Sequence, residues 1–218
     1  MKIRLDAVEE RIQHAVQHCG RTRGDVTLIA VTKVFPASVI RDAYELGLRE
    51  FGENYVQEFQ GKANAVSDLI GARFHLIGHL QSNKSKIASE LFDVIQTVDT
   101  PKLAQRLDAA GKPLDVFLEV KLSAEDSKSG ALPPELPALI DAVKRCSHLR
   151  LTGLMTMPPW SDDAEPSRPY FRALRLLGEQ HGLAALSMGM SHDFEVAIEE
   201  GATHIRVGTA LFGRRKKP

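Results

Sequence analysis

The chain has 218 residues, 43% of them hydrophobic, and its 28 basic side chains balance its 28 acidic ones. This length suits one large domain or two small ones, and the balanced charge argues against a surface made for nucleic acid or for an anionic membrane. The sequence has no apolar run long enough to cross a bilayer, no signal-peptide core, and two cysteines, Cys19 and Cys146. We therefore expect a cytoplasmic protein with buried, reduced thiols and a frayed basic end at residues 214–217.

An amphipathic helix opens the chain, and eight short apolar runs follow it. The helix is predicted from apolar residues at helical spacing, namely Leu5, Val8, Ile12, Ala15, Val16 and Cys19. The predicted strands cover residues 26–32, 50–52, 73–78, 94–98, 116–122, 151–157, 185–189 and 205–208. Capping residues separate the helices between them: Thr100 begins one that Gly111 ends, Gly47 ends another, and Ser191 and Gly201 bracket a third.

The strands are mostly apolar rather than alternating, which is typical of a parallel sheet buried on both faces. Eight such strands with intervening helices predict an α/β fold: a single TIM-type (β/α)8 barrel over residues 1–218, with an extra N-terminal helix. An open doubly wound sheet is the alternative. Long segments at 123–134 and 158–166 are expected as loops at the carboxyl rim, either mobile lids or ordinary surface loops.

Lys33 stands directly after the first strand, where a barrel of this type keeps its chemistry. A lysine amine at a buried rim can condense with an aldehyde. By position alone, an ordinary solvated lysine at the end of a strand is the better explanation. Other candidate site residues follow the later strands, namely Asn54, His79, Ser127, Lys128, Met155 and Thr156.

Two segments near the chain's end favour a phosphate site. Ser187 and Ser191 frame a stretch of small residues before a helix, and Gly208 with Thr209 follows the last strand. Loops after strands seven and eight form the usual phosphate site of such barrels. Arg206 lies inside the last apolar strand, so its charge must be paired either with a buried carboxylate or with a ligand in the barrel mouth. We expect no metal site, since His14 and His18 are one helical turn apart but lie on the N-terminal helix, away from the rim.

Taken together, these segments resemble one family. They are, in order, residues 30–33 (AVTK), 51–55 (FGENY), 75–84 (HLIGHLQSNK), 127–130 (SKSG), 153–157 (GLMTM), 187–191 (SMGMS) and 206–210 (RVGTA). The chain resembles the pyridoxal 5′-phosphate (PLP) homeostasis proteins, the YggS/PROSC family of PLP-binding proteins, over essentially its whole length. The family's barrel is similar to the N-terminal domain of alanine racemase.

The resemblance implies a PLP site at the barrel mouth. Lys33 would form the internal aldimine with the cofactor aldehyde, and Arg206 would face the pyridine nitrogen. The phosphate would be held by Ser187, Ser191, Gly208 and Thr209. Asn54, His79 and Met155 would line the ring pocket. A cation beside the pyridine nitrogen disfavours its protonation, which makes the ring a poorer electron sink.

The resemblance also suggests that turnover is absent. Racemases with this barrel add a second, β-rich domain that supplies catalytic groups, and nothing in this sequence could be that domain; Tyr55 is the one tyrosine near the rim. We therefore expect no catalytic residue and a monomeric PLP carrier, with PLP and apo PLP-dependent enzymes as partners. A weak PLP-dependent amino-acid racemase and a sugar-phosphate aldolase that uses Lys33 without PLP are the alternatives.

Three departures from the family pattern leave every predicted contact in place. Val34 and Phe35 replace a polar pair, His192 stands where a small or acidic residue is usual, and residues 213–218 lack the usual continuation. A histidine near a phosphate could add a titrating cation, so cofactor affinity is expected to fall as pH rises past the histidine range.

Overall fold

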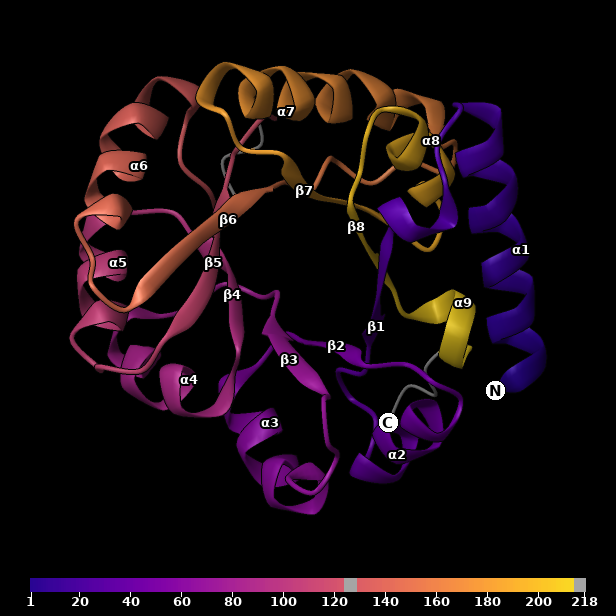
Figure 1. Ribbon diagram of the computed structural model, residues 1–218, viewed down its shortest axis with the longest axis horizontal. Helices are drawn as coiled ribbons and strands as arrows, with labels where there is room; N and C mark the ends of the chain where they lie inside the picture. Colours follow the sequence, from indigo (N-terminus) through magenta and orange to yellow (C-terminus); the bar gives the residue numbers. More distant parts are fainter. Residues whose placement is uncertain (124–128, 214–218) are drawn as a thin grey trace.

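The computed structural model describes residues 1–123 and 129–213, and its strands form a closed parallel barrel (Figure 1). The strands follow one another around the ring in sequence order, and β1 closes it against β8 with Ala30 opposite Val207. This confirms the predicted barrel over the open sheet. The strands are β1 (Thr27–Val31), β2 (Glu50–Glu53), β3 (Arg73–Leu76), β4 (Val94–Val98), β5 (Leu114–Glu119), β6 (Leu149–Met155), β7 (Ala185–Met190) and β8 (His204–Val207).

Helices surround the barrel on its outside (Figure 1). They are α1 (Lys2–His18), α2 (Ala37–Glu45), α3 (Val56–Ala63), α4 (Ser85–Leu91), α5 (Pro101–Asp108), α6 (Leu136–Lys144), α7 (Arg168–His181), α8 (Phe194–Glu199) and α9 (Thr209–Phe212), with short 3-10 turns η1 (Arg23–Asp25), η2 (Asn64–Val66), η3 (Ser82–Lys84), η4 (Pro133–Glu135) and η5 (Glu165–Ser167). The extra N-terminal helix α1 lies beside α8 and α9. Its predicted apolar face is buried from Leu5 to Val16. Cys19 and Cys146 are free thiols, but they are only partly buried, so the expectation of buried thiols was wrong.

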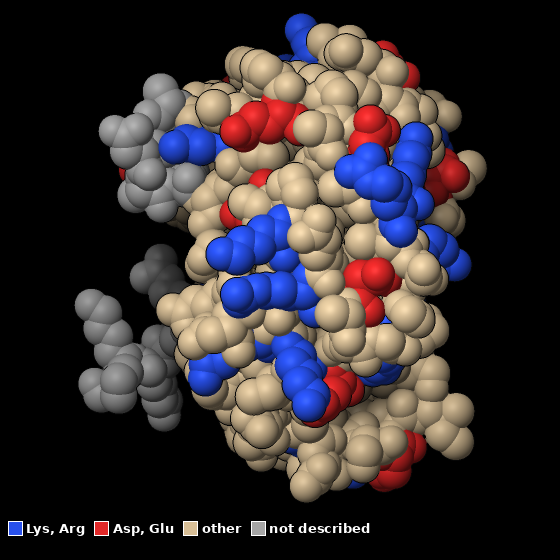
Figure 2. All heavy atoms as spheres, turned by 90° about the vertical axis from the view of Figure 1, so that its left-hand side faces the viewer, with Lys and Arg blue, Asp and Glu red and all other residues tan. Residues whose placement is uncertain are grey.

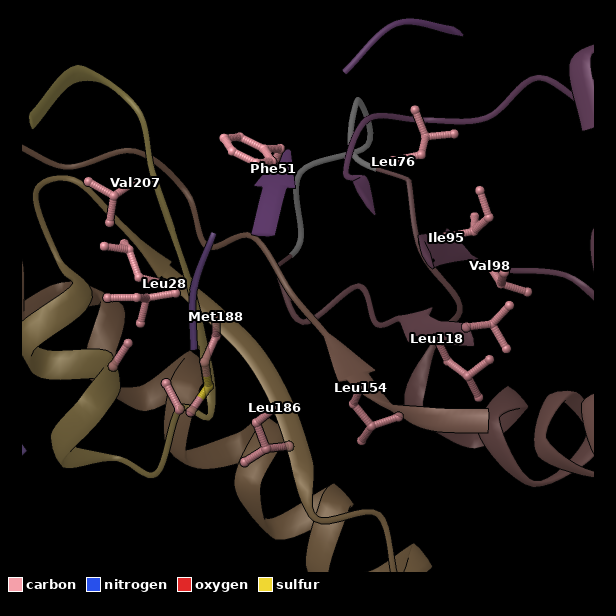
Figure 3. Packing of buried hydrophobic residues seen from close by; sticks show 14 of the residues in the cluster. Leu28, Phe51, Leu76, Ile95, Val98, Leu118, Leu154, Leu186, Met188 and Val207 are labelled. Atoms are coloured by element: carbon pink, nitrogen blue, oxygen red, sulfur yellow. The ribbon is translucent and has the colours of Figure 1, made fainter. Parts of the chain in front are cut away.

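The core has two layers because successive side chains of a strand point to opposite faces. Strand residues that face outward pack beneath the helices, among them Phe51, Leu76, Leu118 and Leu154 (Figure 3). A smaller apolar cluster, Val94, Phe117 and Met155, is separate from this layer. It shares the barrel with buried polar side chains that position the site described below.

The helix ends agree with the sequence at Gly47, Thr100, Gly111 and Gly201 and differ at Ser191. Thr100 Oγ1 accepts the Leu103 N–H at 3.3 Å, and Gly111 ends that helical segment with a φ of 73°. Ser191, however, does not cap α8. The Asp193 carboxylate instead accepts the Met190 N–H at 2.7 Å, so the helix begins only at Phe194, and the Ser191 hydroxyl is used elsewhere.

Some of the residues and loops predicted from the sequence lie in or near the segments that the structure does not describe. Ser127, Lys128 and the basic residues 214–217 lie outside the described residues. The segment 158–166 has little regular structure before η5 begins, as expected of a rim loop. Among the described residues, no helix has the length and apolar character that crossing a membrane requires. The face in Figure 2, on the side of α5 and α6, carries basic and acidic side chains among uncharged ones.

Candidate functional site

A cavity of about 570 Å³ lies at the carboxyl ends of β1, β2 and β8, next to the end of β7. We call it the Lys33 cavity. Six of the nine residues predicted to contact a cofactor line it: Lys33, Asn54, Ser191, Arg206, Gly208 and Thr209. Its volume is within the range of small-molecule sites. The Asn54 Oδ1 atom is buried and has no hydrogen-bond partner among the described residues. A polar ligand in the cavity would supply the missing donor.

Gly78 explains how Asn54 reaches this wall. A Cβ atom added at Gly78 would lie 2.2 Å from the Asn54 carbonyl oxygen. Glycine therefore lets the end of β3 pass directly against the end of β2. A larger residue would push the Asn54 backbone out of place.

Lys62 holds the turn that carries Lys33. This buried lysine donates from Nζ to the Thr32 carbonyl at 3.3 Å and to the Phe35 carbonyl at 3.1 Å. Those two carbonyls flank Lys33, which is partly buried. The ammonium of Lys62 thus fixes the backbone on both sides of the candidate reactive lysine.

Two carboxylates complete this support. Lys62 Nζ lies 2.8 Å from Glu53 Oε1 and 2.8 Å from Glu58 Oε1. Glu53 is fully buried, and desolvation raises its pKa although Lys62 opposes the shift. Glu58 also accepts the Val34 N–H at 2.6 Å. Val34 has a φ of 63°, which is strained for a β-branched residue, so Glu58 helps to maintain an unfavourable turn directly after Lys33.

The Ser191 hydroxyl ties the loops after β7 and β8 together. Its Oγ accepts the Gly208 N–H at 3.2 Å and the Ala210 N–H at 3.3 Å. The N–H of Thr209 opens α9 and so has no acceptor within that helix. Hydroxyl and backbone donors are therefore gathered on one wall of the cavity, which suits a phosphate group.

Arg206 reaches the cavity from inside the barrel and is 3% exposed. It donates to Ser187 Oγ at 2.8 Å and to the Thr156 carbonyl at 2.9 Å. Within the described part of the chain Arg206 forms no direct ion pair, and the carboxylates of Asp193 and Glu119 attract it only at longer range. Burial lowers its pKa to about 10, and it remains a cation at neutral pH.

The other three predicted residues do not line the Lys33 cavity. Ser187 is fully buried beneath Arg206 and donates to Gln96 Oε1 at 2.6 Å. Met155 is fully buried in the inner apolar cluster. His79 lines a separate, smaller cavity, and its Nδ1 lies 3.0 Å from Ser129 Oγ.

Sequence reasoning missed several residues of the cavity wall, Trp160 foremost among them. Its ring centroid lies 4.0 Å from that of His192, and the side chain is 69% exposed. Its place in a rim loop was the available signal. Met157 and Met190 also line the cavity, and no sequence signal separates them from core methionines. No metal-binding group of three or more His, Cys, Asp or Glu side chains occurs among the described residues.

The closed barrel with a lysine after β1 and donors after β7 and β8 defines the class of protein. The chain belongs to the family described as alanine racemase, N-terminal domain, whose model matches residues 3–216. Within it, the chain falls among the pyridoxal phosphate homeostasis proteins. It is 48% identical to the one from Pseudomonas aeruginosa over 95% of this chain and 93% of that protein, and 41% identical to the one from Escherichia coli over 97% and 95%.

Solved structures agree with this placement. PipY from Synechococcus elongatus, solved with PLP bound, has a TM-score of 0.82 and 39% identity, and the match covers 94% of this chain and all of that one. Alanine racemase from Corynebacterium glutamicum is 19% identical with a TM-score of 0.68, and the match covers 97% of this chain but 61% of the racemase. The second likeness concerns the fold alone.

Proposed function

We propose that this protein binds PLP in the Lys33 cavity and serves PLP homeostasis in the cytoplasm. The observation that carries the proposal is the single cavity that joins Lys33 to a wall of hydroxyl and backbone donors. PLP offers an aldehyde, a phosphate and a pyridine nitrogen, and the cavity has a group suited to each. The PLP bound to PipY and the names of the curated relatives support the same cofactor.

Lys33 would attach the cofactor reversibly. Its amine would condense with the aldehyde and release one water molecule, and the reverse reaction would free the cofactor. Ser191, Gly208 and Thr209 would hold the phosphate. Asn54 would line the ring pocket. The contacts of His79, Met155 and Ser187 with the cofactor stay predictions, and since these three residues do not line the Lys33 cavity, the geometry does not favour a direct contact.

We further propose that the bound cofactor does not turn over substrates. Arg206 has only donors, so a pyridine nitrogen facing it would accept a hydrogen bond and stay unprotonated. PLP supplies catalysis by withdrawing electrons, and an unprotonated ring does this poorly. No tyrosine occurs among the described residues that line the cavity. The protein would then act as a carrier that releases PLP, with apo PLP-dependent enzymes as recipients.

The alternative, a weak amino-acid racemase, has one observation in its favour. His192 lines the cavity, and its buried Nε2 lies 3.4 Å from Asp193 Oδ2 without forming a hydrogen bond among the described residues, so it could serve as a second base. Incubation of the PLP-loaded protein with L-alanine, followed by chiral analysis, separates the two functions. Sustained formation of D-alanine would establish the racemase and overturn the carrier.

The test of the cofactor itself is the visible absorbance of the purified protein. We expect a band from covalently attached PLP that is present in the wild type, present in Lys84→Ala and absent from Lys33→Ala. Lys84 is the matched control because it follows β3 in η3. Borohydride reduction and peptide mass analysis should then locate the added mass on Lys33. A colourless wild-type protein that takes up no added PLP would overturn the proposal.

A further inference from the structure

A second cavity opens beside the Lys33 cavity, on the side of β3 and β5. It has a volume of about 170 Å³, and we call it the Glu119 cavity. Polar side chains on its wall include His79, Glu119, Lys121 and Ser123. Met157 lines both cavities, so the two adjoin. The PLP contacts proposed above do not require this space.

Two buried polar atoms of residues on its wall lack hydrogen-bond partners in the part of the chain that the structure describes. Glu119 is 4% exposed, and its Oε2 has no hydrogen-bond partner among the described residues. The same holds for Ser123 Oγ. A buried acceptor without a donor costs the folded state free energy, and such groups are rare. Both residues line this one cavity, and two such atoms in one place indicate that donors enter it.

The charges around Glu119 favour a cationic donor. Burial and the nearby Asp99 raise its pKa to about 7, and Arg206 opposes them. Lys121 and His79 line the same cavity, but neither forms an ion pair with Glu119 among the described residues. Above neutral pH the cavity therefore holds a buried carboxylate without a directly bound cation. An entering cation would offset the cost of burying that charge.

The size and the wall chemistry limit what can enter. The volume corresponds to roughly six water molecules. A metal ion would need more ligands than the described residues bring together here. An ammonium group carries three donors, enough to satisfy both Glu119 and Ser123.

We propose that the Glu119 cavity binds small primary amines in their ammonium form, with the ammonium group on the Glu119 carboxylate. This goes beyond the proposed PLP function, because the site shares only Met157 with the Lys33 cavity and needs no cofactor. Where PLP is present, the same site would hold an amine next to the cavity of the reactive lysine.

The test is calorimetric titration of the full-length protein with ethanolamine at pH 8, after borohydride treatment. The treatment fixes any carbonyl compound on a lysine, so the heat cannot come from cofactor exchange. We expect saturable binding to one site, and none for ethylene glycol, which has the same size without the charge. Glu119→Gln should weaken binding by about tenfold or more. Glu179→Gln, on the exposed face of α7, should not.

The outcomes separate this inference from the PLP proposal. Binding should weaken from pH 8 to pH 6 in the wild type, as the carboxylate is protonated. Ser123→Ala provides a second variant that should reduce affinity without touching the charge. A colourless protein that binds ethanolamine would support the amine site in the Glu119 cavity and overturn the proposal that the protein binds PLP. No saturable binding of ethanolamine, or equal binding by Glu119→Gln, would overturn the proposed amine site even in a protein that carries PLP.

Discussion

Arg206 shows what a single residue in the sequence leaves undecided. An arginine in an apolar strand requires partners, and both a carboxylate and a ligand satisfy that requirement. The structure supplies Ser187 and the Thr156 carbonyl, both neutral acceptors. Hydrogen bonds to neutral groups leave the guanidinium without a directly bound carboxylate among the described residues, and Asp193 and Glu119 attract it only at longer range. The side-chain environment that decides this is set by strands far apart in the sequence, so no local pattern could reveal it.

Glu119 gives a prediction at the same scale, on the pH dependence of stability. Its pKa is about 7 in the folded protein against an ordinary 4.5, so the folded state holds this proton more tightly than the unfolded state. Stability contributed by the protonated form is therefore complete below pH 4.5 and is lost as pH rises through 7. We expect Glu119→Gln to match the wild type near pH 4.5 and to exceed it near pH 8, by on the order of 3 kcal/mol in the free energy of unfolding.

Urea unfolding of both proteins across this pH range provides the measurement. Comparing the two cancels the other titrating groups, including Glu53, whose pKa is also raised by burial. A difference that stays constant with pH would show that the Glu119 proton is not linked to folding.

The element that positions the reactive lysine is the turn between β1 and α2. It depends on one cation, because Lys62 bonds two backbone carbonyls and two carboxylates. We expect Lys62→Met to destabilise the protein by about 3–5 kcal/mol, since Glu53 would be left as a buried carboxylate without its cation. Lys62→Met combined with Glu53→Gln should recover a large part of that loss.

Chemical denaturation of the two variants measures this, and Lys2→Met is the control. Lys2 pairs with Asp6 at 73% and 60% side-chain exposure, and such pairs contribute little to stability. A loss below about 1 kcal/mol for Lys62→Met would mean that the network does not hold the turn.

At the scale of elements, the sequence predicted every strand of the barrel but not all of their ends. Apolar runs mark strands because both faces are buried, and this signal fades at the rims, where β5 and β6 begin two residues earlier than expected. Side-chain direction was the harder question. Met155 and Ser187 lie on the correct strands, yet both side chains are fully buried and neither reaches the cavity wall. A run that is apolar throughout does not show which residues point inward.

In the molecule as a whole, α1 packs against the segments that follow β7 and β8. Arg11 of α1 donates to the Ser191 carbonyl at 3.2 Å and pairs with Glu195 at 2.6 Å. Its guanidinium also lies 4.2 Å from the centre of the Phe194 ring. The sequence predicted this extra helix but gave no reason for it. These contacts supply one, because they hold the loop that bears a predicted phosphate ligand.

We therefore expect Arg11→Ala to weaken PLP binding several-fold, although it lies outside the cavity. The stability loss should be small, about 1 kcal/mol, since the ion pair is partly exposed. Arg41→Ala is the matched control: Arg41 forms an exposed pair with Asp68 and does not line the Lys33 cavity. Titration with PLP, followed by absorbance, measures the affinity of both variants. If the two variants bind PLP equally well, α1 supports the fold of the barrel without positioning Ser191, and the phosphate wall is held by the Ser191 hydroxyl bonds to Gly208 and Ala210 alone.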